Sequence, residues 1–290
     1  MRYEGTVYRP PSEAGSLIIQ LTIGCARNTC TFCNMYKDKK FRIRPLDEVA
    51  EDLAMARNYY NRIQVRRIFL ADGDALIVKT EDLLYIMEKC HEYFPEIERI
   101  SVYGAPKDIL NKTPEELRRL KEAGLDMVYM GLESGADQVL KDVKKGVTAA
   151  EMIEAGQKVK EAGMVLSMTV ISGLGGKKYW QEHAMESARV ISAVKPDYVG
   201  FLTLMVEKGT EIYDQVQSGE IELLNPQEVL DETELFIRNV DAEGTVFRSN
   251  HASNYTALAG TLNADKEKIL AQLETSRRRS SFRPDSYRGI

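Results

Sequence analysis

Residues 24–33 read Gly-Cys-Ala-Arg-Asn-Thr-Cys-Thr-Phe-Cys, and three of the four cysteines of the chain lie in this stretch. Cys25, Cys30 and Cys33 have the spacing C-x4-C-x2-C. The preceding residues 16–23 are apolar and rich in β-branched side chains, which predicts a strand. Three thiols on a loop that leaves a strand end indicate a functional site, because a rigid scaffold positions such loops while leaving them accessible.

The chemistry of three clustered thiolates favours a soft metal ion or an iron–sulfur cluster. A structural zinc site usually takes four protein ligands. The remaining cysteine, Cys90, falls on the apolar stripe of a predicted helix at 80–94, which indicates core packing. A [4Fe–4S] cluster held by three cysteines would leave one iron open to a substrate or cofactor. A zinc-binding module and three unconnected cysteines remain the alternatives at this point.

Composition limits the class of protein. The chain has 290 residues, 43% of them hydrophobic and 29% charged, which suits a globular protein with a sizeable core. A net charge of −5 argues against nucleic acid as the main partner, because phosphate contacts require clusters of Lys and Arg. We find no signal peptide, no apolar run long enough to span a membrane and no disulfide framework. We therefore expect a cytoplasmic protein without membrane contact.

Strand-like and helix-like segments alternate along most of the chain. This alternation, in six strand–helix repeats, predicts an α/β fold with a parallel sheet, either open or closed into a barrel. In both forms the site lies at the carboxyl ends of the strands. A capping box at Thr113 and Glu116 predicts one helix start, Asp47 is expected to cap another helix, and the charged run 37–40 is expected to be exposed. The further predicted strands are 67–71, 100–103, 127–130, 165–171 and 198–202.

The cysteine triplet, with Phe32 before its last member and a strand ahead of the loop, resembles the radical S-adenosylmethionine (SAM) superfamily. The commonest spacing there is C-x3-C-x2-C, so the additional residue in the first gap indicates a variant subgroup. The resemblance covers roughly residues 16–205 and implies a partial (β/α)6 TIM-like barrel with parallel strands. Residues 1–15 then form an extended N-terminal segment, 206–274 a C-terminal α/β extension capping the barrel, and 275–290 a disordered basic tail.

The same resemblance implies cofactor contacts on loops that follow successive strands. Gly73 and Asp74 correspond to a turn that binds the methionine amino group of SAM. Glu133 and Ser134 correspond to residues that contact its ribose hydroxyls or methionine end, and Lys145 to a basic residue that pairs with its carboxylate. The residues implied to lie beside adenine are Phe32, Ser172 and Gly173.

A polar segment in the C-terminal region, residues 248–255, follows a predicted strand at 245–248. His251 is a candidate acid/base or substrate contact, and Asn250 and Asn254 are further candidate substrate contacts. The structural alternative is a hydrogen-bonded turn, which Ser and Asn favour.

The chemistry implied by the resemblance is that of a radical SAM enzyme. Cys25, Cys30 and Cys33 would hold three irons of a [4Fe–4S] cluster that binds SAM and takes an electron from a flavodoxin- or ferredoxin-like donor. Reductive cleavage of SAM would give methionine and a 5′-deoxyadenosyl radical, which abstracts hydrogen from the substrate. An iron–sulfur redox or sensor protein and a zinc-binding module without SAM cleavage are the alternatives.

Two groups within the superfamily look similar to this chain, and each has a feature that the chain lacks. The coproporphyrinogen oxidase-like group carries a further cysteine shortly after the triplet, where this chain has Asn34 and Met35. The Elongator-type tRNA enzymes carry an acetyltransferase domain. We therefore expect a single-cluster enzyme that acts on an unidentified, small organic substrate.

Overall fold

The computed structural model describes residues 1–280 and 282–289 and consists of two compact units. The first unit comprises 1–28, 35–130 and 157–166, and the second unit comprises the remaining segments, 29–34 among them. The cysteine stretch is therefore divided, with Cys25 in the first unit and Cys30 and Cys33 in the second. This division differs from the boundaries expected near residues 15, 205 and 274.

Parallel strands form the sheet of the first unit. Their order is β1 (Leu17–Gln20), β4 (Arg67–Ala71), β5 (Arg99–Tyr103) and β6 (Leu125–Glu133), the last three residues of which belong to the second unit. The strand expected at 16–23 is interrupted at Leu21. Beyond it, β2 (Thr22–Ile23) pairs antiparallel with β3 (Arg42–Ile43), because the Leu21 carbonyl accepts from the N–H of Arg44 rather than continuing along β4. The cysteine loop thus leaves β2 and returns through β3.

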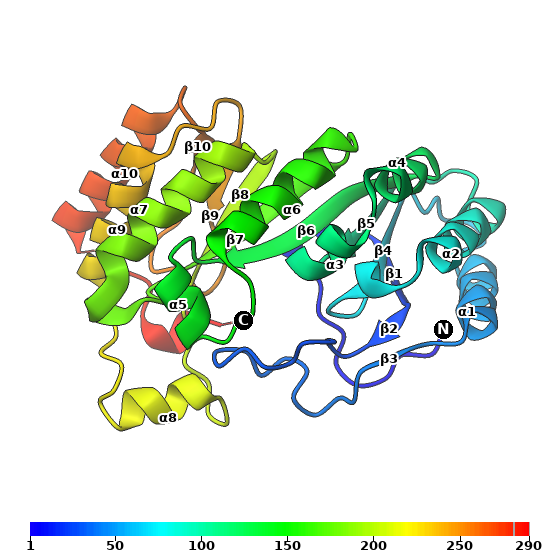
Figure 1. Cartoon of the computed structure of the whole chain (residues 1–290), viewed down its shortest axis with the longest axis horizontal. Helices are drawn as coiled ribbons and strands as arrows, with labels where there is room; N and C mark the ends of the chain where they lie inside the picture. The colour runs from blue at the N-terminus through cyan, green and yellow to red at the C-terminus, as the bar shows by residue number, and fades with distance from the viewer. Residues whose placement is uncertain (281, 290) are drawn as a thin grey trace. The chain divides into compact units, whose positions relative to one another are not determined.

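The helices of the first unit cover this sheet and close its core. Figure 1 shows α1 (Leu46–Tyr59) and α2 (Thr80–Tyr93) side by side. The capping box is confirmed, since Thr113 and Glu116 exchange hydrogen bonds of 2.7 and 3.1 Å at the start of α4 (Pro114–Glu122). The cap expected at Asp47 is wrong, because α1 begins at Leu46 after Pro45. The remaining helical segments are η1 (Pro11–Glu13), η2 (Ala75–Ile77) and α3 (Pro106–Asn111).

Strands of the second unit are β7 (Val165–Ser172), β8 (Tyr198–Thr203), β9 (Val246–Ser249) and β10 (Leu258–Thr261). The first two residues of β7 belong to the first unit. β7, β8 and β9 are parallel, whereas β10 runs antiparallel to β9. Ser172 and Thr203 are register partners at the carboxyl ends of β7 and β8. The sequence pattern did not predict β10, whose four residues Leu-Ala-Gly-Thr carry little periodicity.

Three helices of the second unit, α7 (Gly176–Val194), α9 (Pro226–Asn239) and α10 (Lys266–Arg279), lie side by side in Figure 1. A capping box of Asn225 and Glu228 starts α9. The other helices are α5 (Asp137–Asp142), α8 (Glu211–Gln217) and α6 (Ala149–Glu161), which passes from the second unit into the first, and the short η3 (Asp285–Tyr287). No helix among residues 1–280 and 282–289 has the length and apolar character needed to cross a membrane.

The basic segment expected to be disordered from residue 275 is ordered in the described part of the chain. α10 continues to Arg279, because Arg277 forms ion pairs of 2.6 Å with Asp231 and Glu234 on α9. Further on, Arg283 and Arg288 donate to the backbone carbonyls of residues 251–254. Ser281 and Ile290 lie outside the described residues.

Candidate functional site

The cysteines differ sharply in their surroundings. Cys25, Cys30 and Cys33 are partly exposed thiols outside any disulfide, and Cys33 donates its N–H to the Cys30 carbonyl at 3.4 Å. Cys90 is fully buried on α2, and burial raises the pKa of its thiol to about 12, so it stays protonated. The prediction that Cys90 packs in the core is confirmed. Within residues 1–280 and 282–289, no three His, Cys, Asp or Glu side chains are gathered as a preformed metal site.

A buried ion pair anchors the start of the cysteine loop in the first unit. The Asp72 carboxylate accepts from the N–H of Gly24 at 3.1 Å and from Lys39 Nζ at 2.9 Å. Gln20 Nε2 is a third donor, also at 3.1 Å. The side chain of Lys39 is only 6% exposed, so the expectation of a solvated charged run is wrong at this position. A lysine within a run of charges carries no sequence signal that distinguishes a buried partner from an exposed one.

Gly73 lies beside the first cysteine of the motif. Its N–H donates to the Gly24 carbonyl at 3.2 Å. A Cβ atom at Gly73 would lie 3.1 Å from the Cβ of Cys25 and 2.6 Å from Cε2 of the buried Tyr36. The absence of a side chain at this turn therefore leaves room for Cys25 and Tyr36.

Replacing Gly73 with Ala should destabilise the protein by about 1–3 kcal/mol, because the added methyl group overpacks the contact with Tyr36 and Cys25. Urea unfolding followed by circular dichroism measures the change. Gly200→Ala is the matched control, since a Cβ there meets no atom within 4 Å. Equal stability of the two variants would show that the turn at Gly73 accommodates the added methyl group without loss of stability.

Asp74 points into the protein in the first unit. Its side chain is fully buried, and Oδ1 accepts from the N–H of Ala105, which precedes α3. Burial raises the pKa of the Asp74 carboxyl to about 8, and the neighbouring Asp108 adds to the effect. The carboxyl is thus engaged with the residue that precedes α3.

The last part of the cysteine motif lies in the second unit between α5 and α8. Thr31 donates its N–H to the Val143 carbonyl and accepts from the N–H of Ile212, at 3.1 and 3.0 Å. Phe32 packs against the apolar cluster of Ala136, Val139, Val143, Leu174 and Ile212. These contacts fix the ring of Phe32 beside the segment that follows β6.

Glu133 and Lys145, two of the predicted SAM contacts, lie together in the second unit. Lys145 Nζ is 2.8 Å from Glu133 Oε1, and each side chain is 13% exposed. Glu133 ends β6 with a positive φ of 62°. Gly131 makes the pairing feasible, because a Cβ at that position would collide with the Glu133 carboxylate and crowd Lys145 Nζ.

Ser172 ends β7, and Ser134 and Gly173 directly follow β6 and β7. Two buried side chains that sequence reasoning missed contact Ser134 and Gly173. His183 Nδ1 lies 2.8 Å from Ser134 Oγ, and Glu232 Oε1 accepts from the N–H of Gly173 at 2.9 Å. Burial lowers the pKa of His183 to about 4 and raises that of Glu232 to about 8. Both sit within helical patterns, where nothing marks them as buried polar groups.

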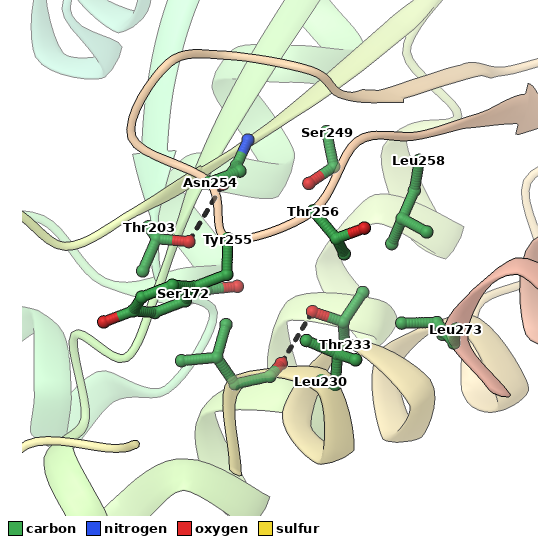
Figure 2. Close-up of a pocket in the computed structure, with 11 residues that line it drawn as sticks. Ser172, Thr203, Leu230, Thr233, Ser249, Asn254, Tyr255, Thr256, Leu258 and Leu273 are labelled. Atoms are coloured by element: carbon green, nitrogen blue, oxygen red, sulfur yellow. Dashed lines mark hydrogen bonds between the residues drawn. The ribbon is translucent and has the colours of Figure 1, made fainter. Parts of the chain in front are cut away.

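The candidate substrate residues have different environments. Asn250 is exposed, and the His251 ring accepts from the N–H of Ser253 at 3.1 Å. Asn254 is buried, accepting from Thr203 Oγ1 and donating to the Phe201 carbonyl. Figure 2 shows Asn254 and Ser172 on one small pocket, whose other polar walls are Thr203, Thr233, Ser249, Tyr255 and Thr256. A predicted cofactor residue and a predicted substrate residue therefore share one pocket.

Comparison with known proteins assigns the family. A family model described as the radical SAM superfamily matches residues 19–188, more than half of the chain. The chain therefore belongs to the radical SAM superfamily.

Individual relatives are distant. The chain is 26% identical over 167 residues to a putative methylthiotransferase of Methanocaldococcus jannaschii, a match covering 55% of this chain and 35% of that protein. It is 21% identical over 223 residues to the heme chaperone HemW of Bacillus subtilis, covering 74% and 57%. A similar solved structure is the radical SAM methyltransferase TsrM from Kitasatospora setae with cobalamin and a [4Fe–4S] cluster bound. Its TM-score is 0.56 and its identity 18%, over 70% of this chain and 39% of that one.

The chain thus spans about one third to just over half of the length of these proteins. Membership confirms the predicted family, the radical SAM enzymes, a family whose cofactors are a [4Fe–4S] cluster and SAM. The predicted fold class, α/β with a partial barrel of parallel strands and a C-terminal α/β extension, is also confirmed. Enzymes of this superfamily carry out SAM-dependent radical chemistry and need an external electron donor and a substrate.

Proposed function

We propose that this chain uses a [4Fe–4S] cluster and one external electron to cleave SAM, generating a 5′-deoxyadenosyl radical that takes hydrogen from a small organic substrate. The observation that carries the proposal is the set of three partly exposed thiols outside any disulfide, on one loop anchored by Asp72. Thiolates are the usual ligands of such clusters, so Cys25, Cys30 and Cys33 fit the group. The protein itself contributes binding, orientation and exclusion of water.

Lys145 and Glu133 are suited to hold the polar ends of SAM. An ammonium group has three donors, so Lys145 Nζ can keep its bond to Glu133 and still pair with the methionine carboxylate. Glu133 retains acceptor capacity for ribose hydroxyls. Low exposure of both side chains strengthens these contacts, because charges interact more strongly away from water. Phe32, packed on its apolar cluster, is suited to flank the adenine.

A small substrate is favoured over a nucleic acid. The pocket in Figure 2 is lined by hydroxyl, amide and aliphatic groups without a charged side chain. Arg277, in the basic segment that begins at residue 275, is paired with Asp231 and Glu234. A flavodoxin- or ferredoxin-like protein is the proposed electron donor, and the reducing cytoplasm the proposed compartment, since free thiols persist there.

Anaerobic reconstitution with iron and sulfide, followed by a 5′-deoxyadenosine assay with a chemical reductant, tests the proposal. Cys30→Ala should lose cluster iron and product formation to background, because two thiolates cannot hold the cluster. Cys90→Ala is the matched control and should retain both, since Cys90 is buried in α2. Zinc in place of iron would favour a zinc-binding module. Bound iron without SAM cleavage would favour a redox or sensor protein.

A further inference from the structure

Two neighbouring buried polar side chains, His183 and Glu232, each hold one turn of the second unit. Ser134 follows β6, and its Oγ accepts from the N–H of Ala136 at 3.1 Å. The hydroxyl proton of Ser134 is then available for His183 Nδ1, 2.8 Å away on α7. A neutral ring that accepts at Nδ1 carries its proton on Nε2. This atom lies 3.8 Å from Glu232 Oε1 on α9, which is a packing contact and too long for a hydrogen bond.

Glu232 holds the turn after β7. Glu232 Oε1 accepts from the N–H of Gly173 at 2.9 Å. Glu232 Oε2 is buried and has no hydrogen-bond partner in the described part of the chain. In a further hydrogen bond, the N–H of Gly135 donates to Ser187 Oγ on α7 at 2.8 Å. The turn at Ser134–Gly135 is therefore held by side chains of α7 and the turn at Gly173 by a side chain of α9, and these two helices pack against each other.

We propose that His183 and Glu232 are positioning residues, which set the distance between the turn at Glu133–Gly135 and the turn at Ser172–Gly173 so that both can contact one SAM molecule. This inference rests on the proposed function, because it assigns both turns to SAM. Neither residue touches the cofactor itself. They act through Ser134 and through the Gly173 backbone.

Burying two polar side chains is energetically less favourable than filling the same space with apolar ones, which supports a positioning role for His183 and Glu232. His183 and Glu232 are each 1% exposed, and a buried polar group is unfavourable unless it is hydrogen-bonded. Apolar side chains of similar volume often stabilise a core as well as a buried polar pair does. What apolar residues cannot do is accept a hydrogen bond from Ser134 or Gly173 and so fix the two turns at one spacing.

Two pairs of variants separate positioning from simple packing. His183→Leu and Glu232→Leu remove the hydrogen bonds to Ser134 and Gly173, whereas His183→Asn and Glu232→Gln keep an acceptor near each of them. The exposed His91 on α2 supplies the matched control, His91→Leu. Two readouts apply to each protein: SAM affinity of the reconstituted protein by equilibrium dialysis, and amide hydrogen exchange of peptides 131–136 and 172–176 in the protein as isolated.

We expect both Leu variants to bind SAM at least tenfold more weakly and to exchange faster in both peptides. The Asn and Gln variants should lie close to wild type in both readouts. Should a Leu variant fail to fold, His183→Phe and Glu232→Met, which preserve the side-chain volume more closely but accept no such hydrogen bond, take its place. Tenfold weaker SAM binding by either variant decides for the proposal, and wild-type affinity decides against it. Wild-type SAM affinity and exchange in the folded Leu variants would overturn the inference alone. A wild-type protein that binds no SAM would overturn the proposed function as well.

Discussion

Replacing Lys39 with Met is expected to destabilise the protein by about 3–5 kcal/mol, because the change leaves the buried Asp72 carboxylate without its cation. Asp72 has no exposed surface, and Lys39 Nζ is its closest charged partner at 2.9 Å. The remaining donors, Gln20 and the Gly24 N–H, are neutral and do not compensate for a charge. Urea unfolding at neutral pH measures the loss of stability.

The double variant Lys39→Met with Asp72→Asn provides the decisive comparison. Removing both charges leaves a neutral amide that still accepts from Gln20 and Gly24, so the double variant should recover most of the lost stability. A double variant as unstable as Lys39→Met would contradict the explanation. The Gly24 contact also predicts that the single variant loosens the backbone immediately before Cys25.

We expect the stability of the wild-type protein to decline with rising pH, and Glu232→Gln should remove much of this decline. The pKa of Glu232 is raised from 4.5 to about 8 by burial. Below pH 4.5 this carboxyl is protonated in both folded and unfolded protein. Between about pH 4.5 and 8 the unfolded chain releases the proton while the folded protein retains it, so the contribution to stability is lost as pH rises through this window.

The expected size of this effect is on the order of several kcal/mol, since each unit of pKa difference corresponds to about 1.4 kcal/mol. The pKa of Asp74 is also raised to about 8, so this carboxyl lowers stability in the same way as pH rises. That part of the decline should persist in Glu232→Gln. The pKa of His183 is lowered to about 4, so its effect on stability has the opposite sign. The stability contributed by the neutral ring is lost as pH falls below 6.5. Unfolding free energies at pH 5.5 and 8 test the prediction. Wild type and variant with parallel pH dependence would refute it, and exposed Glu243→Gln is the control.

Local signals predicted the elements whose residues carry periodicity or a cap. The capping box at Thr113 and the strand at 165–171 are examples, because both depend on neighbouring residues alone. The helix at 211–217 and the strand at 258–261 escaped prediction because each is short. The helix is also held by a distant partner, since the N–H of Ile212 donates to the Thr31 carbonyl. The break at Leu21 likewise follows from a change of strand partner.

The residues of the candidate site also include some that the sequence could predict and some that it could not. A family resemblance identified Glu133 and Lys145, and the structure brings them into contact. His183 and Glu232 could not be found from sequence, because their significance lies in burial and in the turns they reach. Lys39 was misjudged for a related reason, since its charged neighbours in the sequence do not share its surroundings.

The arginine contacts of residues 282–289 bear on how the protein is handled at the bench. Arg283 and Arg288 supply donors to four consecutive carbonyls at 251–254, and Arg288 also reaches the Leu204 carbonyl just beyond β8. Trimming the chain ahead of Arg283 to aid crystallisation would strip those carbonyls of their partners next to the pocket in Figure 2. Expression vectors should therefore leave this segment intact, with any purification handle separated from it by a flexible spacer.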